Sequence, residues 1–504
     1  MTGKPSHLKL SSVLIYPNTE QVALASLGFL KVFHLLSKAT SVADYTYFPF
    51  GKTRRVVSPR KGLLVGAVTG RPVGSFDLVA FSLAYENDFV RVPQMLRMAG
   101  LEVLSPRRKE VFPFVLFGGF TMASNPLPVA DFADAILIGE AEPVINRILS
   151  ELERAKSDGL ARRDVLERLA SIDGLFIPEF GNHPVRRVYA DLDEIGMPLA
   201  TGRASHFGGM VLVEVGRGCG RGCLFCSAGS LYRPVRFKPI EDLIAGIAEH
   251  AHVGLLGTAV GDHPGLIALL KAVVSGEKTA GLSSLRPDEI TPELGELLVR
   301  SHIKTIALAP ETGSDDLRKR IGKPISRDRI VESVAILADA GLKTIKLYFM
   351  IGLPREQQSD VEGIVDLVSE MARVRRRSRL AVTASPFVPK PHTPLQWAGF
   401  ASDRVIAARL KVLKNINRIR GCSLKPGSIG EAWVEACLSR GERSLAGVLL
   451  EIQPFENPRT VLKKSGLIDP TVELDTSKPL PWDFIDNLIP KKRLVEAYES
   501  FVRS

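Results

Sequence analysis

Short apolar runs alternate with amphipathic stretches along the first 190 residues of the chain. Between the apolar runs lie helical patterns such as residues 26–38. This alternation predicts a doubly wound, Rossmann-like parallel sheet with helices on its faces. The runs that read as buried strands are residues 12–17, 76–83, 113–119 and 134–140.

A second alternation of strands and helices begins at residue 210. Its six apolar runs are separated mostly by amphipathic stretches, which predicts a parallel barrel or partial barrel of six βα units, with its chemistry at the carboxyl ends of the strands. These runs are residues 210–216, 252–262, 280–288, 303–314, 342–354 and 380–391. The predicted divisions are an N-terminal sheet domain (1–190), a linker (191–209), the barrel (210–400) and a small, mostly helical C-terminal subdomain packed on the barrel (401–504).

Composition describes an ordinary globular protein. The 504 residues are 45% hydrophobic and 24% charged. The five cysteines are few, and their number is odd, which argues against a secreted disulfide framework. No signal-peptide pattern or membrane-spanning apolar run is present, so we expect a cytoplasmic protein without a membrane partner. The net charge of +11 suits an anionic partner but does not identify one.

Three of the cysteines lie close together just after the first barrel strand. Cys219, Cys223 and Cys226 fall within GRGCGRGCLFC, residues 216–226. A structural zinc site takes four protein ligands, and no His lies within ten residues. Three thiolates instead fit a [4Fe–4S] cluster whose fourth iron is open to a non-protein ligand. Arg217 and Arg221 are candidates to balance its negative charge, although solvated loop arginines are as common.

The two remaining cysteines are distant in sequence from this loop. Cys422 and Cys437 sit in a helical pattern some two hundred residues away. There we expect small buried hydrophobic side chains.

The C-x3-C-x2-C spacing, with the aromatic Phe225 before the last cysteine, resembles the radical S-adenosylmethionine (radical SAM) enzymes. The resemblance implies that the open iron binds S-adenosylmethionine and that reductive cleavage yields a 5′-deoxyadenosyl radical. It also implies that Gly261 and Asp262, in AVGDHPG, bind the methionine amino group. Ile351 and Gly352 resemble the element that contacts adenine.

Polar residues at the end of the fourth barrel strand extend this resemblance. Glu311, Thr312 and Ser314 resemble the family's residues that bind the ribose and carboxylate of S-adenosylmethionine. Residues 385–397 resemble its last adenine-side segment. Each of these positions also suits a turn or a barrel-layer residue. The predicted cosubstrate contacts therefore require that the barrel bring these residues together.

The chain further resembles a radical SAM subgroup that carries a cobalamin (B12)-binding-type domain before the barrel, close to members whose reaction is unassigned. The resemblance and the sheet edge together suggest Gly118, Gly119, Gly139 and Glu140 as contacts of cobalamin. Glycines there also suit tight strand-to-helix turns. The Asp-x-His-x-x-Gly loop that supplies a lower histidine to cobalt is absent after residues 12–17, which leaves open both cobalamin without a protein ligand and a domain that has lost it.

The leading hypothesis is a radical SAM iron–sulfur enzyme, with cobalamin-dependent methyl transfer or another radical modification of an unidentified substrate. Its electron donor would be a flavodoxin or a ferredoxin. One alternative is tRNA modification, because the run RVRRRSRL (373–380) suits RNA phosphates; such a run more often ends a solvated helix. The other alternative is a non-catalytic iron–sulfur protein that relays electrons or senses cobalamin.

Overall fold

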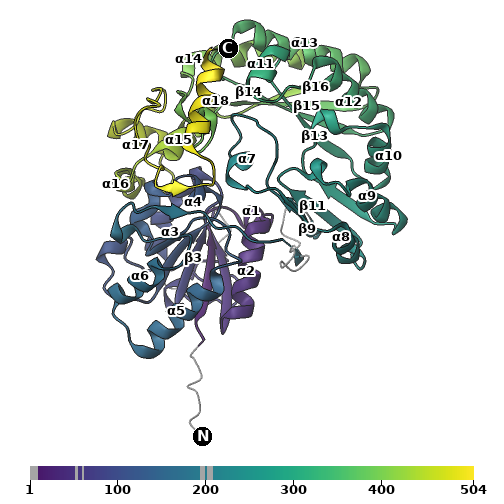
Figure 1. Cartoon of the computed structure of the whole chain (residues 1–504). Helices are drawn as coiled ribbons and strands as arrows, with labels where there is room; N and C mark the ends of the chain where they lie inside the picture. The colour runs from purple at the N-terminus through teal and green to yellow at the C-terminus, as the bar shows by residue number, and fades with distance from the viewer. Residues whose placement is uncertain (1–8, 51–54, 59–61, 193–198, 201–207, 504) are drawn as a thin grey trace.

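The computed structural model describes residues 9–50, 55–58, 62–192, 199–200 and 208–503. Within them the chain forms two α/β bodies and a helical C-terminal part, as the sequence predicts. Figure 1 shows the purple-to-blue N-terminal body beside the teal-to-green barrel, with the yellow C-terminal segment against both. Most of the predicted linker, 191–209, lies outside the described residues.

The N-terminal body is a six-stranded, mostly parallel sheet. Its strands are β1 (Ser11–Tyr16), β2 (Val42–Tyr47), β3 (Leu78–Ser82), β4 (Phe114–Gly118), β5 (Ala135–Leu137) and β6 (Leu175–Phe176). The order is β2-β1-β3-β4-β5-β6, with only β6 antiparallel. The strand order therefore reverses between β1 and β3, and ligands of such sheets bind at the carboxyl ends near that point.

Helices cover both faces of this sheet. Val13 and Ile15 of β1 belong to one hydrophobic cluster and Leu14 and Tyr16 to another, because successive side chains of a strand point to opposite faces. The helices are α1 (Glu20–Ala23), α2 (Leu27–Ala39), α3 (Val92–Met98), α4 (Phe120–Ser124), α5 (Ile145–Asp158) and α6 (Arg162–Ala170).

Strand β2 is absent from the sequence-based prediction. Its sequence, VADYTY, includes the buried polar residues Asp44 and Thr46. The Asp44 carboxylate accepts hydrogen bonds from the backbone N–H groups of Val68 and Thr69, at 3.0 and 2.8 Å. Thr46 donates to the carbonyl of Val65 at 2.9 Å. A neighbouring loop thus satisfies the polar groups, so the strand is buried without an apolar run.

The barrel contains the six predicted parallel strands. Strands β9 to β12 and β13 to β15 lie in two sheets that an isolated parallel bridge between Leu285 and Leu308 connects. The strands are β9 (Val211–Arg217), β11 (His252–Gly257), β12 (Thr279–Leu282), β13 (Thr305–Glu311), β14 (Thr344–Ile351) and β15 (Arg379–Pro386). The short strands β8 (Leu199–Ala200) and β10 (Arg236–Phe237) pair antiparallel with β9. The helices around the strands are α8 (Ile240–Ile247), α9 (Leu266–Ser275), α10 (Pro292–Arg300), α11 (Asp315–Arg320), α12 (Arg327–Asp339) and α13 (Gln358–Val374).

A further parallel strand, β16 (Cys422–Pro426), pairs with β15. The prediction that Cys422 lies in a helical pattern is therefore wrong. Gly421, at φ +80°, turns the chain from the preceding helical segment onto the free edge of β15, where backbone pairing outweighs the local pattern. Cys437, by contrast, is fully buried in helix α15 (Ile429–Arg440), which confirms the expectation for it.

The C-terminal part is mostly helical and contacts both bodies. Helix α15 packs on residues 86–91 of the N-terminal body, and Asn125 Nδ2 donates to the Ser439 and Gly441 carbonyls at 3.1 and 2.8 Å. The C-terminal part therefore joins the sheet to the barrel, and does not pack on the barrel alone. The other helices are α14 (Asp403–Leu413), α16 (Leu445–Glu451), α17 (Pro458–Ser465) and α18 (Lys491–Arg503). Strand β17 (Ile485–Asp486) pairs with β7 (Val185–Arg186) of the N-terminal body.

Among the described helices, none is both long and apolar enough to cross a membrane.

Burial of His392 between the barrel and the N-terminal body predicts a loss of stability in acid. Desolvation lowers the pKa of His392 to about 4, and its Nε2 lies 3.1 Å from the carbonyl oxygen of Ser124. Below about pH 6.5 the unfolded chain binds a proton at this histidine, whereas the folded chain keeps it neutral down to about pH 4. The free energy of unfolding therefore falls as pH falls from 6.5 towards 4. The expected contribution is about 3 kcal/mol over that window.

The measurement is the free energy of unfolding against pH for the wild type and His392→Asn. The slope between pH 6.5 and 4 should be smaller in the variant, because asparagine does not titrate and tolerates the φ of +58° found there. His302→Asn is the matched control, since His302 also has positive φ but is exposed. Equal slopes in His392→Asn and the wild type would contradict the prediction.

Candidate functional site

The cysteine loop connects β9 to helix α7 (Ser227–Leu231) at the carboxyl end of the barrel. Gly218, at φ +85°, permits the close approach of the chain to Tyr232, because a Cβ there would lie 2.5 Å from the Tyr232 carbonyl oxygen. The backbone N–H of Leu224 donates to the carbonyl of Ile321 at 3.0 Å. The loop is thereby fixed against the segment that follows β13.

The three thiols of this loop lie near one another. All three are free and partly buried. Burial raises the pKa of Cys223 to about 11, and the neighbouring Cys226 thiol adds to the rise. Burial also raises the pKa of Cys226, while Cys219 acts on it in the same direction. These thiols therefore share one region of the loop.

The donor set fits a [4Fe–4S] cluster. Thiolates are the preferred ligands of such clusters, and three of them leave one iron open. The described residues include no group of three His, Cys, Asp or Glu side chains that could hold a single metal ion. A cube does not require such a group, since each thiolate binds a different iron.

Glu311 ends β13 beside the cysteine loop. It is buried, at φ +70°, and Lys323 Nζ lies 2.7 Å from its Oε1. Burial raises the pKa of Glu311, against the opposing charge of Lys323. Its carboxyl group acts on the pKa of both Cys223 and Cys226, so the structure brings this predicted residue to the cysteines.

Thr312 and Ser314 follow Glu311, and their polar groups have structural partners. The Ser314 hydroxyl accepts from the Leu317 N–H as the N-cap of α11 and donates to Asp360. The Thr312 carbonyl accepts from Arg318, which is itself fully buried. The two residues are held firmly at the barrel edge, and the Ser314 side chain serves the helix.

Gly261 and Asp262 follow β11 and face the cysteine loop. Asp262 Oδ1 lies 2.5 Å from Arg221 Nη2, and Arg221 Nη2 lies 3.3 Å from Glu289 Oε1. A Cβ at Gly261 would lie only 1.7 Å from Glu289 Oε2. The charge of Arg221 is therefore balanced by these protein carboxylates, which is a different role from the balancing of cluster charge considered from the sequence.

Phe225, Ile351 and Gly352 lie on the barrel side of the loop. Phe225 packs against the hydrophobic cluster that contains Leu317 and Phe387. Ile351 is buried at the end of β14, and the Gly352 N–H donates to Glu356 Oε2 at 2.8 Å. A cavity of about 470 Å³ opens here, lined on one side by Phe225 and Cys226; we name it the barrel-mouth cavity. Its other lining residues include Tyr85, Met350, residues 385–388, Lys390, Glu431 and Glu435.

A second cavity, also about 470 Å³, lies between the N-terminal sheet and the barrel; we name it the interdomain cavity. The carboxyl ends of β1, β3, β4 and β5 form one wall, and β9, β11 and α7 form the other. The structure brings all four predicted residues of the sheet edge to it: Gly118, Gly119, Gly139 and Glu140.

The two positive-φ glycines of this cavity are also required by the fold. A Cβ at Gly119 (φ +114°) would lie 2.4 Å from the Leu83 carbonyl oxygen, and one at Gly139 (φ +125°) would lie 2.1 Å from that of Val188. A side chain at either position would displace backbone before it reached a ligand. These glycines leave the rim of the cavity without side chains, but substitutions there do not isolate ligand binding.

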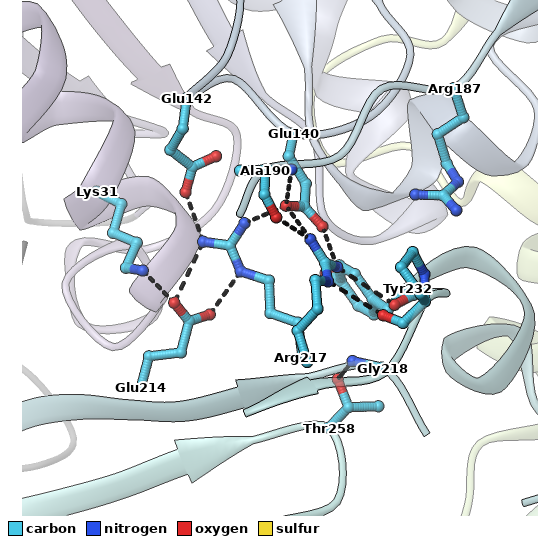
Figure 2. A network of polar contacts seen from close by, with 12 residues as sticks. Lys31, Glu140, Glu142, Arg187, Ala190, Glu214, Arg217, Gly218, Tyr232 and Thr258 are labelled. Atoms are coloured by element: carbon cyan, nitrogen blue, oxygen red, sulfur yellow. Dashed lines mark hydrogen bonds and ion pairs between the residues drawn. The ribbon is translucent and has the colours of Figure 1, made fainter. Parts of the chain in front are cut away.

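An ion-pair network joins the sheet to the barrel at the interdomain cavity (Figure 2). Arg217, at the end of β9, binds Glu140 and Glu142 of the N-terminal body, each at 2.5 Å, and Glu214 at 2.7 Å. Lys31 of α2 also pairs with Glu214. The guanidinium of Arg217 is thus bound to three carboxylates, which is not the cluster-balancing role considered from the sequence.

The network fixes the charge of Glu140. Burial alone would raise the pKa of Glu140, but the hydrogen bond from Arg236 and the charge of Arg217 outweigh it and hold that pKa below its usual value. Arg236 Nη2 lies 2.8 Å from Glu140 Oε1. Sequence reasoning missed this arrangement; the signal was Glu214, a charge inside the otherwise apolar strand VLVEVG, which needs a partner when buried.

No histidine is among the described residues that line the interdomain cavity. His34 lies on α2 and is exposed.

Comparisons with known proteins define the class of this chain. The model described as "Radical SAM proteins, N-terminal" matches residues 28–178, and the model "Radical SAM superfamily" matches residues 213–368. The chain belongs to the radical SAM superfamily. It is an enzyme, and the cofactors of its family are a [4Fe–4S] cluster and S-adenosylmethionine.

Individual relatives differ in how much of the chain they match. An uncharacterized protein of Methanocaldococcus jannaschii is 26% identical over 90% of this chain and 94% of its own length. Ribosomal protein uS12 methylthiotransferase RimO of Thermotoga maritima is 26% identical over 32% of this chain and 41% of its own length.

The fold is also similar to a solved structure. The radical S-adenosylmethionine methyltransferase TsrM of Kitasatospora setae, solved with cobalamin and a [4Fe–4S] cluster bound, has a TM-score of 0.54 at 14% identity. The alignment covers 98% of this chain and 99% of that one. At this identity the likeness shows a shared fold.

Proposed function

We propose that this radical SAM enzyme binds cobalamin in the interdomain cavity and transfers a methyl group to an unactivated carbon of its substrate. One observation carries the proposal: the cavity lies at the carboxyl edge of a 2-1-3-4-5 sheet and is closed on its other side by the strand and helix that flank the cysteine loop. Open α/β sheets bind ligands at this edge. A ligand there would lie between the sheet and the cysteines.

The interdomain cavity suits a large, mainly apolar ring. Its walls are mostly aliphatic and aromatic, and the tilted rings of Phe120 and Tyr232 meet between the two bodies with their centroids 5.1 Å apart. The glycines at 118, 119 and 139 allow close approach at the sheet edge. When bound, the cluster and S-adenosylmethionine supply a 5′-deoxyadenosyl radical and cobalamin carries the methyl group.

Residues of this chain have separate roles in the proposal. Cys219, Cys223 and Cys226 hold the cluster. Glu311 accepts hydrogen bonds from the cosubstrate, because its buried carboxylate is beside the cysteines and, within the described part of the chain, forms an ion pair with Lys323 alone. The other cosubstrate contacts are Phe225, Gly261, Asp262, Thr312, Ser314, Ile351 and Gly352, all at the carboxyl ends of the barrel strands or in the loops that follow them.

The substrate is proposed to occupy the barrel-mouth cavity. That cavity borders Cys226 and receives residues from the sheet domain, the barrel and helix α15. Lys390 is half-buried in it between Glu86 and Glu435, at 2.7 Å from each. These ion pairs hold the sheet domain, the barrel and helix α15 around the barrel-mouth cavity. Their charged groups offer hydrogen bonds to a polar substrate.

Oxygen-sensitive clusters and free thiols favour a reducing compartment, so we place the enzyme in the cytoplasm with a flavodoxin or a ferredoxin as electron donor. The arginine run gives little support to an RNA substrate. Arg375 binds the carbonyls of Ser378 and Arg420, and Arg376 pairs with Asp339 at 2.7 Å. These arginines follow directly on the C-terminus of α13, where positive charge interacts favourably with the helix dipole.

The test is retention of hydroxocobalamin by the anaerobically reconstituted protein, followed by incubation with dithionite and S-adenosylmethionine. We expect the wild type to co-elute with about one cobalamin per chain and to release 5′-deoxyadenosine. Ala84→Trp should fill the interdomain cavity, which Ala84 lines, and lose cobalamin while keeping its iron. Ala407→Trp is the matched control, because Ala407 is exposed on α14.

Failure of the wild type to retain cobalamin at micromolar concentration would contradict the methyl-transfer proposal. Release of 5′-deoxyadenosine by such a protein would instead indicate a radical enzyme that works without cobalamin. Absence of that product in a cluster-loaded protein would favour an electron-relay or sensing role. Co-purification of stoichiometric RNA would favour the tRNA-modifying alternative.

A further inference from the structure

Arg187 is a buried cation in the wall of the interdomain cavity. It follows strand β7, lines the cavity and is 2% exposed. Its Nη2 donates to the Arg233 carbonyl oxygen at 2.5 Å. Its Nε and Nη1 are buried and, within the described part of the chain, have no hydrogen-bond partner. Buried donors are normally paired, so this exception needs an explanation.

The other charged residues that line the cavity are paired with one another. Arg217 binds three carboxylates, and Lys31 pairs with one of them, Glu214. Arg187, by comparison, forms no ion pair among the described residues. Figure 2 shows Lys31 within the ion-pair network and Arg187 outside it, on the opposite side. Burial lowers the pKa of Arg187, and the nearby charge of Glu140, already bound by two arginines, offsets this only in part.

The backbone holds Arg187 firmly in this place. Its N–H donates to the Asp486 carbonyl oxygen at 2.9 Å, so β17 of the C-terminal part fixes it from one side. The next residue, Val188, exchanges hydrogen bonds with Ile138 and Glu140 at the carboxyl end of β5. The guanidinium is therefore presented beside Gly139 and Glu140 by two parts of the chain. A side chain needed only for packing would not require a charge here.

We propose that Arg187 binds the phosphodiester group of the corrinoid in the interdomain cavity. This inference rests on the proposed function. An uncompensated buried cation favours an anion, and the planar fork of arginine matches two phosphate oxygens. The corrin amides are neutral and would leave the charge unpaired, whereas the phosphodiester carries the negative charge of the nucleotide tail. Arg187 thus determines which corrinoids the enzyme accepts.

The test compares two ligands, hydroxocobalamin and cobinamide, which lacks the phosphodiester and the nucleotide. Binding of each to the anaerobic, full-length protein is measured by equilibrium dialysis. The wild type should bind hydroxocobalamin at least about 10-fold more tightly than cobinamide. Arg187→Met should lose that preference, with its cobinamide affinity unchanged. Arg186→Met is the matched control, because the neighbouring Arg186 is exposed and pairs only loosely with Asp486, at 3.7 Å.

A second readout uses the protein without ligand. Arg187→Met removes an unpaired buried charge, so its thermal midpoint without corrinoid should equal or exceed that of the wild type. A folded variant that keeps the wild-type preference, or that loses both ligands equally, would overturn the inference while leaving the proposed function intact. Retention of neither ligand by the wild type would overturn both.

Discussion

Replacing Cys223 with Ala should remove the iron–sulfur cluster and with it the cleavage of S-adenosylmethionine. The reconstituted wild type should contain about four irons and four sulfides per chain, and the variant should lose most of both. Two thiolates in a loop that provides no fourth cysteine cannot hold the cube. Iron and sulfide analysis, visible absorbance and the yield of 5′-deoxyadenosine with dithionite are the measurements.

Cys422→Ala is the matched control for this variant. Cys422 is also free and partly buried, but it lies on β16, outside the cysteine loop. It should keep full iron and full cleavage. Zinc at one per chain, with no iron after anaerobic purification of the wild type, would contradict the cluster assignment.

Replacing Arg217 with Met should destabilise the joint between the two bodies by about 3 kcal/mol, because a buried network loses its central cation. Glu142 would lose its ion pair with Arg217, and Glu140 and Glu214 would each keep one cation in place of two. The Arg217 side chain is 10% exposed, and the side chains of Glu140 and Glu214 are 7% and 9% exposed. Arg236 and Lys31 would still bind Glu140 and Glu214. The measurement is the urea midpoint of unfolding.

The exposed pair of Arg163 and Glu167 provides the control. These side chains are 72% and 54% exposed, so Arg163→Met should change the free energy of unfolding by less than about 0.5 kcal/mol. A shift in Arg217→Met no larger than that of the control would show that the network does not stabilise the joint. The comparison separates a buried network from an ordinary surface ion pair.

The sequence by itself determined the order of the elements and the chemistry of the cysteine loop. Apolar runs mark β1, β3, β4 and β5 and the six barrel strands, because buried strands of parallel sheets need few polar residues. Three cysteines in eight positions restrict the donor set without any long-range contact. The apolar runs and the cysteine spacing are both local patterns, so they can be recognised without knowledge of the fold.

The local pattern fails to predict a strand whose stabilising partner lies elsewhere in the chain. Strand β2 escaped prediction because a loop satisfies Asp44 and Thr46. Cys422 was placed in a helix because only the free edge of β15 makes its segment a strand. In both cases the partner lies far enough along the chain that no pattern within the segment reports it.

Only the tertiary structure decided what the charged residues of the interdomain cavity do. Arg217 and Arg221 read equally well as neighbours of a cluster or as solvated loop residues, yet each binds carboxylates from distant segments. Arg187 lies in a stretch that carried no functional signal, and its unpaired nitrogens become visible only when its surroundings are known. Ion pairing depends on which side chains meet in space and on their burial, and the one-dimensional sequence records neither.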